Sequence, residues 1–129
     1  MEPEFLTLDE ALAIQAEQIE RYGGTEGVRD HGLLASALAM PAATYGGQFL
    51  HPNLFEMAAA YLFHLCKNHP FLDGNKRTAL AASLAFLWLN DLEVVADPDE
   101  IAELVLGVAD GSVGKAQVAV YLEERARQL

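Results

Sequence analysis

The residues best suited to chemistry stand together in one short segment, His69 to Arg77, between two apolar stretches. Lys76 and Arg77 follow Gly74 and would lie in the first turn of the next helix. The positive end of the helix dipole disfavours each cation there by roughly 0.3–1 kcal/mol. A phosphate at this helix start would receive backbone N–H groups, the dipole and two side-chain charges together. The segment therefore predicts a site for phosphate groups.

The remaining polar groups of the segment complete a set suited to phosphate transfer. Asp73 offers a hard oxygen ligand of the kind that Mg²⁺ takes, with phosphate and water filling its other positions. His69 can be neutral near neutral pH and accept a proton from an attacking hydroxyl. Gly74 lets the backbone approach a phosphate closely. This inventory predicts a site for ATP with Mg²⁺.

Each of these residues also has an ordinary structural interpretation. Asp73 could simply be the N-cap of the following helix, and His69 could be a loop or core histidine. Pro70 is expected to stiffen the loop and Phe71 to anchor it in the core. The structural interpretation alone does not explain two adjacent cations at the unfavourable end of a helix.

The bulk composition favours one soluble domain covering residues 1–129. The chain is 52% hydrophobic and 21% charged, which is typical of a folded globule. Its net charge of −11 disfavours direct binding to nucleic acid or to an anionic membrane. A single cysteine excludes an internal disulfide, and the acidic start lacks the features of a secretory signal. A cytoplasmic location is therefore expected.

The pattern of caps and apolar positions predicts an all-α fold, a bundle of about six helices. The first helix starts with a capping box, Thr7 to Glu10, and presents Leu8, Leu12 and Ile19 on one face. The expected helices cover residues 8 to about 20, 31–40, 54–66, 78–89, 98–110 and 113 to about 127. The helix 78–89 is apolar on nearly every face and should be the buried centre, Trp88 included. Residues 92–95 could form a short extended piece.

A loop precedes the third helix, between residues 42 and 52, and shows no helical period. It contains the run Tyr45, Gly46, Gly47, Gln48 and Phe49. We interpret this run as a flexible flap, with a merely loose surface loop as the alternative.

The segment 69–77 matches the motif His-Pro-Phe-x-Asp/Glu-Gly-Asn-Gly/Lys-Arg of the Fic/Doc family. Lys76 in the place of glycine resembles the Doc, or death-on-curing, branch. Residues 27–41 also resemble the stretch upstream of the motif in that branch. One position differs, because Gly74 stands where the best-known Doc pattern has alanine. The likeness covers most of the chain and implies a single Fic-fold helical domain.

The resemblance implies a role for each residue of the loop. His69 would be the catalytic base, Asp73 the metal ligand, and Asn75 and Arg77 the phosphate ligands, with Gly74 beside them. Lys76 would occupy the space through which other Fic enzymes admit phosphates. The nucleotide would then present its terminal phosphate, as in a kinase.

The resemblance also implies a biological setting, that of a toxin in a type II toxin–antitoxin system. The target would be a protein of the translation machinery, elongation factor Tu by analogy, and the effect growth arrest. The flap from Tyr45 to Phe49 would hold the target as an added strand. The chain lacks the inhibitory Ser/Thr-x-x-x-Glu-Gly/Asn motif, so a separate cognate antitoxin is expected to inhibit it.

Several alternatives remain open at this level. Fic-type AMP transfer is the rival reaction, and a non-catalytic binding module is the rival class. A zinc site formed by His64, Cys66 and His69 is disfavoured, because side chains so close on one helix seldom converge on one metal. Arg29 could fold over the site or form a surface ion pair. The other histidines, His31 and His51, are expected at the surface or in turns.

Overall fold

The computed structural model describes residues 2–129, which form six α-helices and two short antiparallel ribbons. The predicted all-α class is confirmed. Within residues 2–129, every helix is too short or too polar to traverse a lipid bilayer. The helices are α1 (Leu8–Tyr22), α2 (His31–Ala39), α3 (Leu54–Asn68), α4 (Asn75–Leu89), α5 (Pro98–Asp110) and α6 (Lys115–Arg125), and a 3₁₀ helix, η1 (Met40–Ala42), follows α2.

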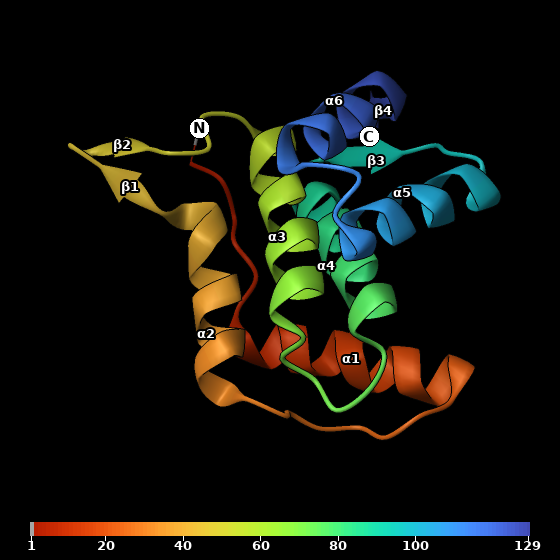
Figure 1. Cartoon of the computed structure of the whole chain (residues 1–129). Helices are drawn as coiled ribbons and strands as arrows, with labels where there is room; N and C mark the ends of the chain where they lie inside the picture. Colours follow the sequence, from red (N-terminus) through yellow and green to blue (C-terminus); the bar gives the residue numbers. More distant parts are fainter. Residues whose placement is uncertain (1) are drawn as a thin grey trace.

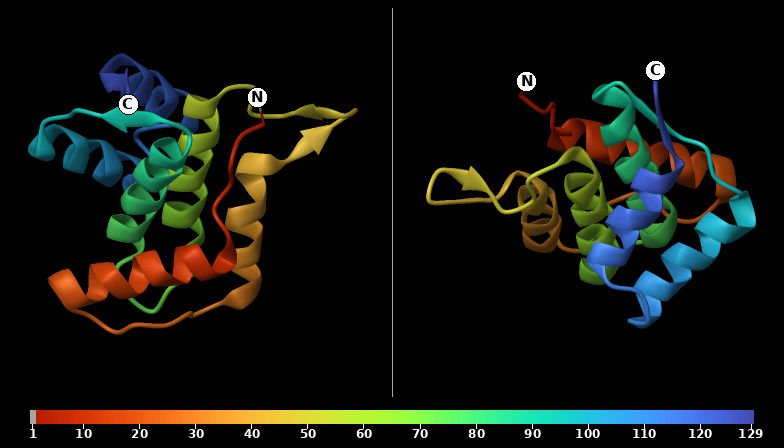
Figure 2. Two further views of the ribbon diagram at one scale, coloured as in Figure 1. Left: turned by 180° about the vertical axis from the view of Figure 1, so that it is seen from behind. Right: turned by 90° about the horizontal axis from the view of Figure 1, so that it is seen from above.

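Helices α3 and α4 run antiparallel through the centre of the molecule (Figure 1). Helix α2 packs beside α3, α6 packs on another side of α3, and α1 crosses the end where a loop joins α3 to α4 (Figures 1 and 2). Tyr61 and Phe86 meet between the central helices with ring centroids 5.1 Å apart, and both are fully buried. The loop that carries the motif is therefore held by the two most deeply packed helices.

The buried stripe of α4 is narrower than its composition suggests. Its buried apolar residues are Ala79, Ala82, Phe86 and Leu87, which follow the helical spacing of one face. Trp88 lies off this stripe and is 57% exposed, so the expectation that it belongs to the core was wrong. Leu8 of α1 is also exposed, because Ala11 and Gln15 are the residues that this helix buries.

Local capping residues start four of the helices as predicted. The capping box of α1 is complete: the Glu10 N–H donates to Thr7 Oγ1 at 3.1 Å, and the Thr7 N–H donates to Glu10 Oε1 at 2.8 Å. Asp30, Asn53 and Asp97 cap α2, α3 and α5 with their side chains. These starts depend only on neighbouring residues, which is why the sequence indicates them.

The two ribbons lie at the edge of the helix core, where Phe49 of one and Leu92 and Val94 of the other pack against it. Strands β1 (Thr44–Tyr45) and β2 (Gln48–Phe49) form a hairpin within the loop that follows η1. Strand β3 (Leu92–Val94) confirms the expected extended piece and pairs with β4 (Ala126–Gln128). The prediction that the last helix reaches about Arg127 was therefore wrong. The chain leaves α6 after Arg125 because residues 126–128 bond to β3.

Candidate active site

The first residue of the motif, His69, stands at the end of α3 in a left-handed conformation, with φ of 52°. The guanidinium of Arg29 stabilises this turn: its Nε donates to the His69 carbonyl at 2.7 Å and its Nη2 to the Asn68 carbonyl at 3.1 Å. Arg29 was expected to fold over the site or to form a surface ion pair. It does neither, because it caps the carbonyl end of α3. It thereby fixes the backbone that carries the imidazole.

The segment 24–30 lies beside the motif loop and forms its second wall. Val28 makes an antiparallel bridge with Phe71, and the Leu72 N–H donates to the Gly27 carbonyl at 3.0 Å. The residue types in this segment gave no indication that it lies beside the motif loop. The glycine at position 27 was the one indication in the sequence that the backbone here is constrained. The structure shows the reason: its φ is 134°, and a Cβ there would lie 3.1 Å from Leu72 Cδ1.

Pro70 and Phe71 are buried, and Phe71 is only 1% exposed, which agrees with its expected role as an anchor. Asn75 holds this anchor. Its Oδ1 accepts the Phe71 N–H at 2.9 Å, and its Nδ2 donates to the Phe71 carbonyl at 3.1 Å and lies 3.2 Å from Nδ1 of His69. The side chain is 5% exposed, so its polar atoms stabilise the loop and orient the imidazole.

Asp73 does not cap α4, and that interpretation was wrong. The N-cap is Gly74, with φ of 72° and no side-chain hydrogen bond to the helix. The turn at Gly74 directs the Asp73 side chain to the segment 24–30, where Oδ2 accepts the Thr25 N–H at 2.7 Å. The carboxylate is exposed to solvent, and its other oxygen, Oδ1, forms no hydrogen bond within residues 2–129. Asp73 thus retains an oxygen that could bind a metal ion.

The two cations lie in the first turn of α4, as predicted, but in different surroundings. Arg77 donates to the carbonyls of Gly23 at 3.1 Å and Gln18 at 3.4 Å and lies over the ring of Tyr22. It therefore interacts with the negative end of α1. Lys76 is exposed and has no ion pair within the described chain. Its charge at a helix start favours an anion.

A cavity of about 280 Å³ opens at this loop. The residues that line it include the histidine, the aspartate and both cations of the motif; they are His69, Leu72, Asp73, Gly74, Asn75, Lys76 and Arg77. The residues of the motif thus line one cavity. Among residues 2–129 no group of three or more His, Cys, Asp or Glu side chains is arranged to hold a metal ion.

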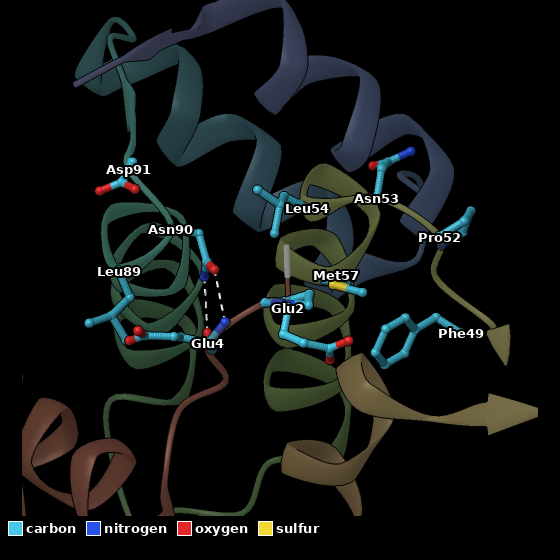
Figure 3. A pocket seen from close by; sticks show the side chains of 11 residues that line it. Glu2, Glu4, Phe49, Pro52, Asn53, Leu54, Met57, Leu89, Asn90 and Asp91 are labelled. Atoms are coloured by element: carbon cyan, nitrogen blue, oxygen red, sulfur yellow. Dashed lines mark hydrogen bonds between the residues drawn. The ribbon is translucent and has the colours of Figure 1, made fainter. Parts of the chain in front are cut away.

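A somewhat larger cavity, of about 310 Å³, lies at the opposite end of α3 and α4 (Figure 3). Among the described residues, its lining includes Glu2, Glu4 and Asp91 and no lysine or arginine. Such a wall repels phosphate. The cavity at the motif, which Lys76 and Arg77 line, is therefore the candidate active site.

The predicted flap does not reach this site. The hairpin that contains Tyr45, Gly46, Gly47, Gln48 and Phe49 lies at the start of α3, whereas His69 lies at its end (Figures 1 and 2). Helix α3 has 15 residues, which is about 22 Å of helix. The structure therefore does not bring the flap residues together with the motif. The segment 24–30 occupies the place beside the loop instead.

The three residues considered for zinc also point to different neighbours. His64 Nε2 lies 2.9 Å from the Lys115 ammonium, which also contacts the buried His51 at 3.1 Å. Cys66 is buried, and burial raises the pKa of its thiol. His51 lies in a bend, one of the two places expected for it, but it is buried and contacts Lys115 of α6, so it is not a surface residue.

Comparison with known proteins confirms the family resemblance of the chain. The model of the Fic/DOC family matches residues 5–87. The chain is 49% identical over 78 residues to a protein named Toxin Doc from Mycolicibacterium smegmatis, a match that spans 60% of each protein. It is 36% identical over 111 residues to a protein named Protein kinase doc from Escherichia phage P1, which covers 86% of each.

Proposed function

Because the chain belongs to the Fic/Doc family, we propose that it is a Doc-like toxin that transfers the terminal phosphate of ATP to a protein hydroxyl. The target is a protein of the translation machinery, elongation factor Tu by analogy, which places the toxin in the cytoplasm. The transfer arrests growth until a cognate antitoxin binds. The similarity to proteins named as a toxin and as a protein kinase supports this proposal.

The observation that carries the proposal is the exposed ammonium of Lys76 at the start of α4, which lines the motif cavity and forms no ion pair within residues 2–129. A terminal phosphate there would meet this ammonium, backbone N–H groups of the first turn and the positive helix end. Arg77 retains further N–H groups beyond the two that bind α1. The cavity can thus neutralise the charge of the transferred group without a further protein partner.

Asp73 is the residue that would hold Mg²⁺, through the oxygen that Thr25 leaves free. When bound, the metal would neutralise charge on the phosphates. A single carboxylate suits Mg²⁺, which commonly uses one or two carboxylates and completes its shell with phosphate and water.

His69 is the base of the proposed reaction. The acceptor oxygen forms a bond to the terminal phosphorus, the bond from that phosphorus to the bridging oxygen of ADP breaks, and the hydroxyl proton passes to the imidazole. Arg29, from the neighbouring segment 24–30, holds the backbone that carries this ring through its bond to the His69 carbonyl. Positioning of this kind supplies much of the acceleration in phosphate transfer.

AMP transfer remains the second candidate, on the strength of Gly74. A Cβ at this position would lie 3.4 Å from Nη2 of Arg77. Glycine therefore leaves the Arg77 guanidinium more freedom toward phosphates than alanine would. The two reactions differ in which phosphorus is attacked, so labelling can separate them.

The experiment is incubation of the purified protein with cell extract, Mg²⁺ and ATP labelled on either the α or the γ phosphate. Label on a protein from γ only indicates phosphate transfer, and label from α indicates AMP transfer. His69→Ala should abolish either signal. Lys76→Met should greatly weaken labelling, whereas Lys67→Met, which removes another exposed lysine outside the cavity, should not.

A growth assay provides a second test. Expression without an antitoxin should slow growth, and His69→Ala should relieve the effect. Equal toxicity of the mutant, or a wild-type protein that labels nothing and binds no ATP, would leave a non-catalytic binding module as the better account.

A further inference from the structure

Gln15 is a polar residue in an apolar position. It lies in the middle of α1 on the face that packs against the motif loop, and its side chain is only 1% exposed. Burying a primary amide costs free energy unless its donor and acceptor groups are paired. The partners of this amide therefore show what it does.

Every hydrogen bond of the Gln15 side chain goes to the backbone of the two segments that form the site. Its Nε2 donates to the carbonyl of Asp73 at 3.1 Å and to that of Thr25 at 3.4 Å. Its Oε1 accepts the Gly27 N–H at 3.3 Å. One buried side chain thus connects α1, the segment 24–30 and the motif loop.

The same two residues, Thr25 and Asp73, are joined directly by the hydrogen bond from the Thr25 N–H to Asp73 Oδ2, at 2.7 Å. Gln15 therefore holds the backbone at both ends of the bond that orients the carboxylate. The packing around this bond is close, since a Cβ on Gly24 would lie 3.1 Å from Asp73 Cβ. A shift of the segment 24–30 must accordingly move the Asp73 side chain.

We propose that Gln15 is a positioning residue that presents the free carboxylate oxygen of Asp73 to the metal ion of the bound nucleotide. The inference rests on the proposed function, because it takes Asp73 as the metal ligand. It assigns the amide a role that an apolar side chain of similar size could not perform. Groups that orient a metal ligand commonly contribute about 10–100-fold to metal affinity.

The test compares Gln15→Met with the wild type by calorimetric titration of a non-hydrolysable ATP analogue, with and without Mg²⁺. Methionine fills a similar volume but forms none of the three hydrogen bonds. The affinity gained by adding Mg²⁺ should fall about tenfold in the variant, whereas Mg²⁺-free affinity should change little. Val118→Ala, a buried change in α6, is the matched control for general loss of stability and should keep the full gain.

Hydrogen exchange gives a readout that needs neither metal nor nucleotide. The Thr25 amide should exchange slowly in the wild type and at least several-fold faster in Gln15→Met. If methionine prevents folding, Gln15→Glu serves instead. It keeps the acceptor for Gly27 but loses the donor to Asp73, so the Mg²⁺-dependent gain should still fall.

The outcomes separate this inference from the proposed function. A variant that is less stable but keeps both the Mg²⁺-dependent gain and slow exchange at Thr25 would show that Gln15 only supports the fold, and would overturn the inference. A wild type without any Mg²⁺-dependent gain would refute Asp73 as the metal ligand, and with it both proposals. If Gln15→Met lost the Mg²⁺-dependent gain in nucleotide affinity and Val118→Ala kept it, the positioning role would be supported.

Discussion

The amide of Asn75 and the imidazole of His69 form an ordered pair, with Nδ2 of Asn75 lying 3.2 Å from Nδ1 of His69. Phe71 fixes the orientation of the amide, because its N–H needs the Asn75 oxygen and its carbonyl needs the Asn75 nitrogen. Since Nδ2 can only donate, Nδ1 of the neutral ring accepts and the ring proton lies on Nε2. Binding of the acceptor hydroxyl must therefore displace this contact or change the tautomer before the ring can act as a base.

This arrangement predicts the effect of Asn75→Ala. The change leaves the buried N–H of Phe71 without an acceptor, so the free energy of unfolding should fall by about 2 kcal/mol. Denaturant unfolding measures that loss. Nitrogen NMR of the imidazole should show Nε2–H in the resting wild type and a mixture of tautomers in the variant. A mixture already present in the wild type would contradict the ordered pair.

Arg29→Met tests the backbone support of the catalytic ring. Without the guanidinium, the carbonyls of Asn68 and His69 lose their donors and the left-handed turn at His69 is less constrained. Transfer activity should fall by roughly tenfold or more, because small displacements of a catalytic group are costly. Arg21→Met, an exposed arginine on α1, is the control and should be nearly neutral. Equal rates for the two variants would argue against this support.

Gly74→Ala tests the N-cap of α4. The φ of 72° is unfavourable for alanine, and the new Cβ would lie 3.3 Å from Ile19 Cδ1. The free energy of unfolding should fall by about 1–2 kcal/mol. Gly46→Ala is a matched control, since Gly46 also has a positive φ, of 60°, but has open space around its Cβ position. If the free energy of unfolding fell less for Gly74→Ala than for Gly46→Ala, the contact with Ile19 Cδ1 would not matter.

The contact of His64 with Lys115 predicts a dependence of stability on pH. Burial, followed by the nearby ammonium of Lys115, lowers the pKa of His64 from 6.5 to about 4. Between these values the unfolded chain binds a proton that the folded chain does not, so stability falls as the pH falls from 6.5 to about 4. The partly exposed ring should account for roughly 1–2 kcal/mol of this loss.

His64→Gln checks the assignment, because glutamine cannot titrate. Thermal unfolding between pH 7 and pH 4 should show a shallower decline for the variant than for the wild type. Parallel curves would place the acid sensitivity in other groups.

The sequence by itself determined the helices and the chemical inventory of the loop. Capping residues such as Thr7, Asp30 and Asn53 bond to backbone groups a few positions away. The helix starts can therefore be predicted from the local sequence. The motif from His69 to Arg77 is likewise contiguous, and its match to the Fic/Doc family needs no tertiary contact. The fold class followed from the same local signals.

The tertiary structure alone decided which partners these groups meet. The carboxylate of Asp73 binds an N–H 48 residues earlier, at Thr25, instead of capping its own helix. The amide of Gln15 joins the two walls of the site, and residues 126–128 leave their helix for β3. Each outcome depends on contacts between segments far apart in the chain, and local periodicity and capping carry no information about such contacts because they report only on near neighbours.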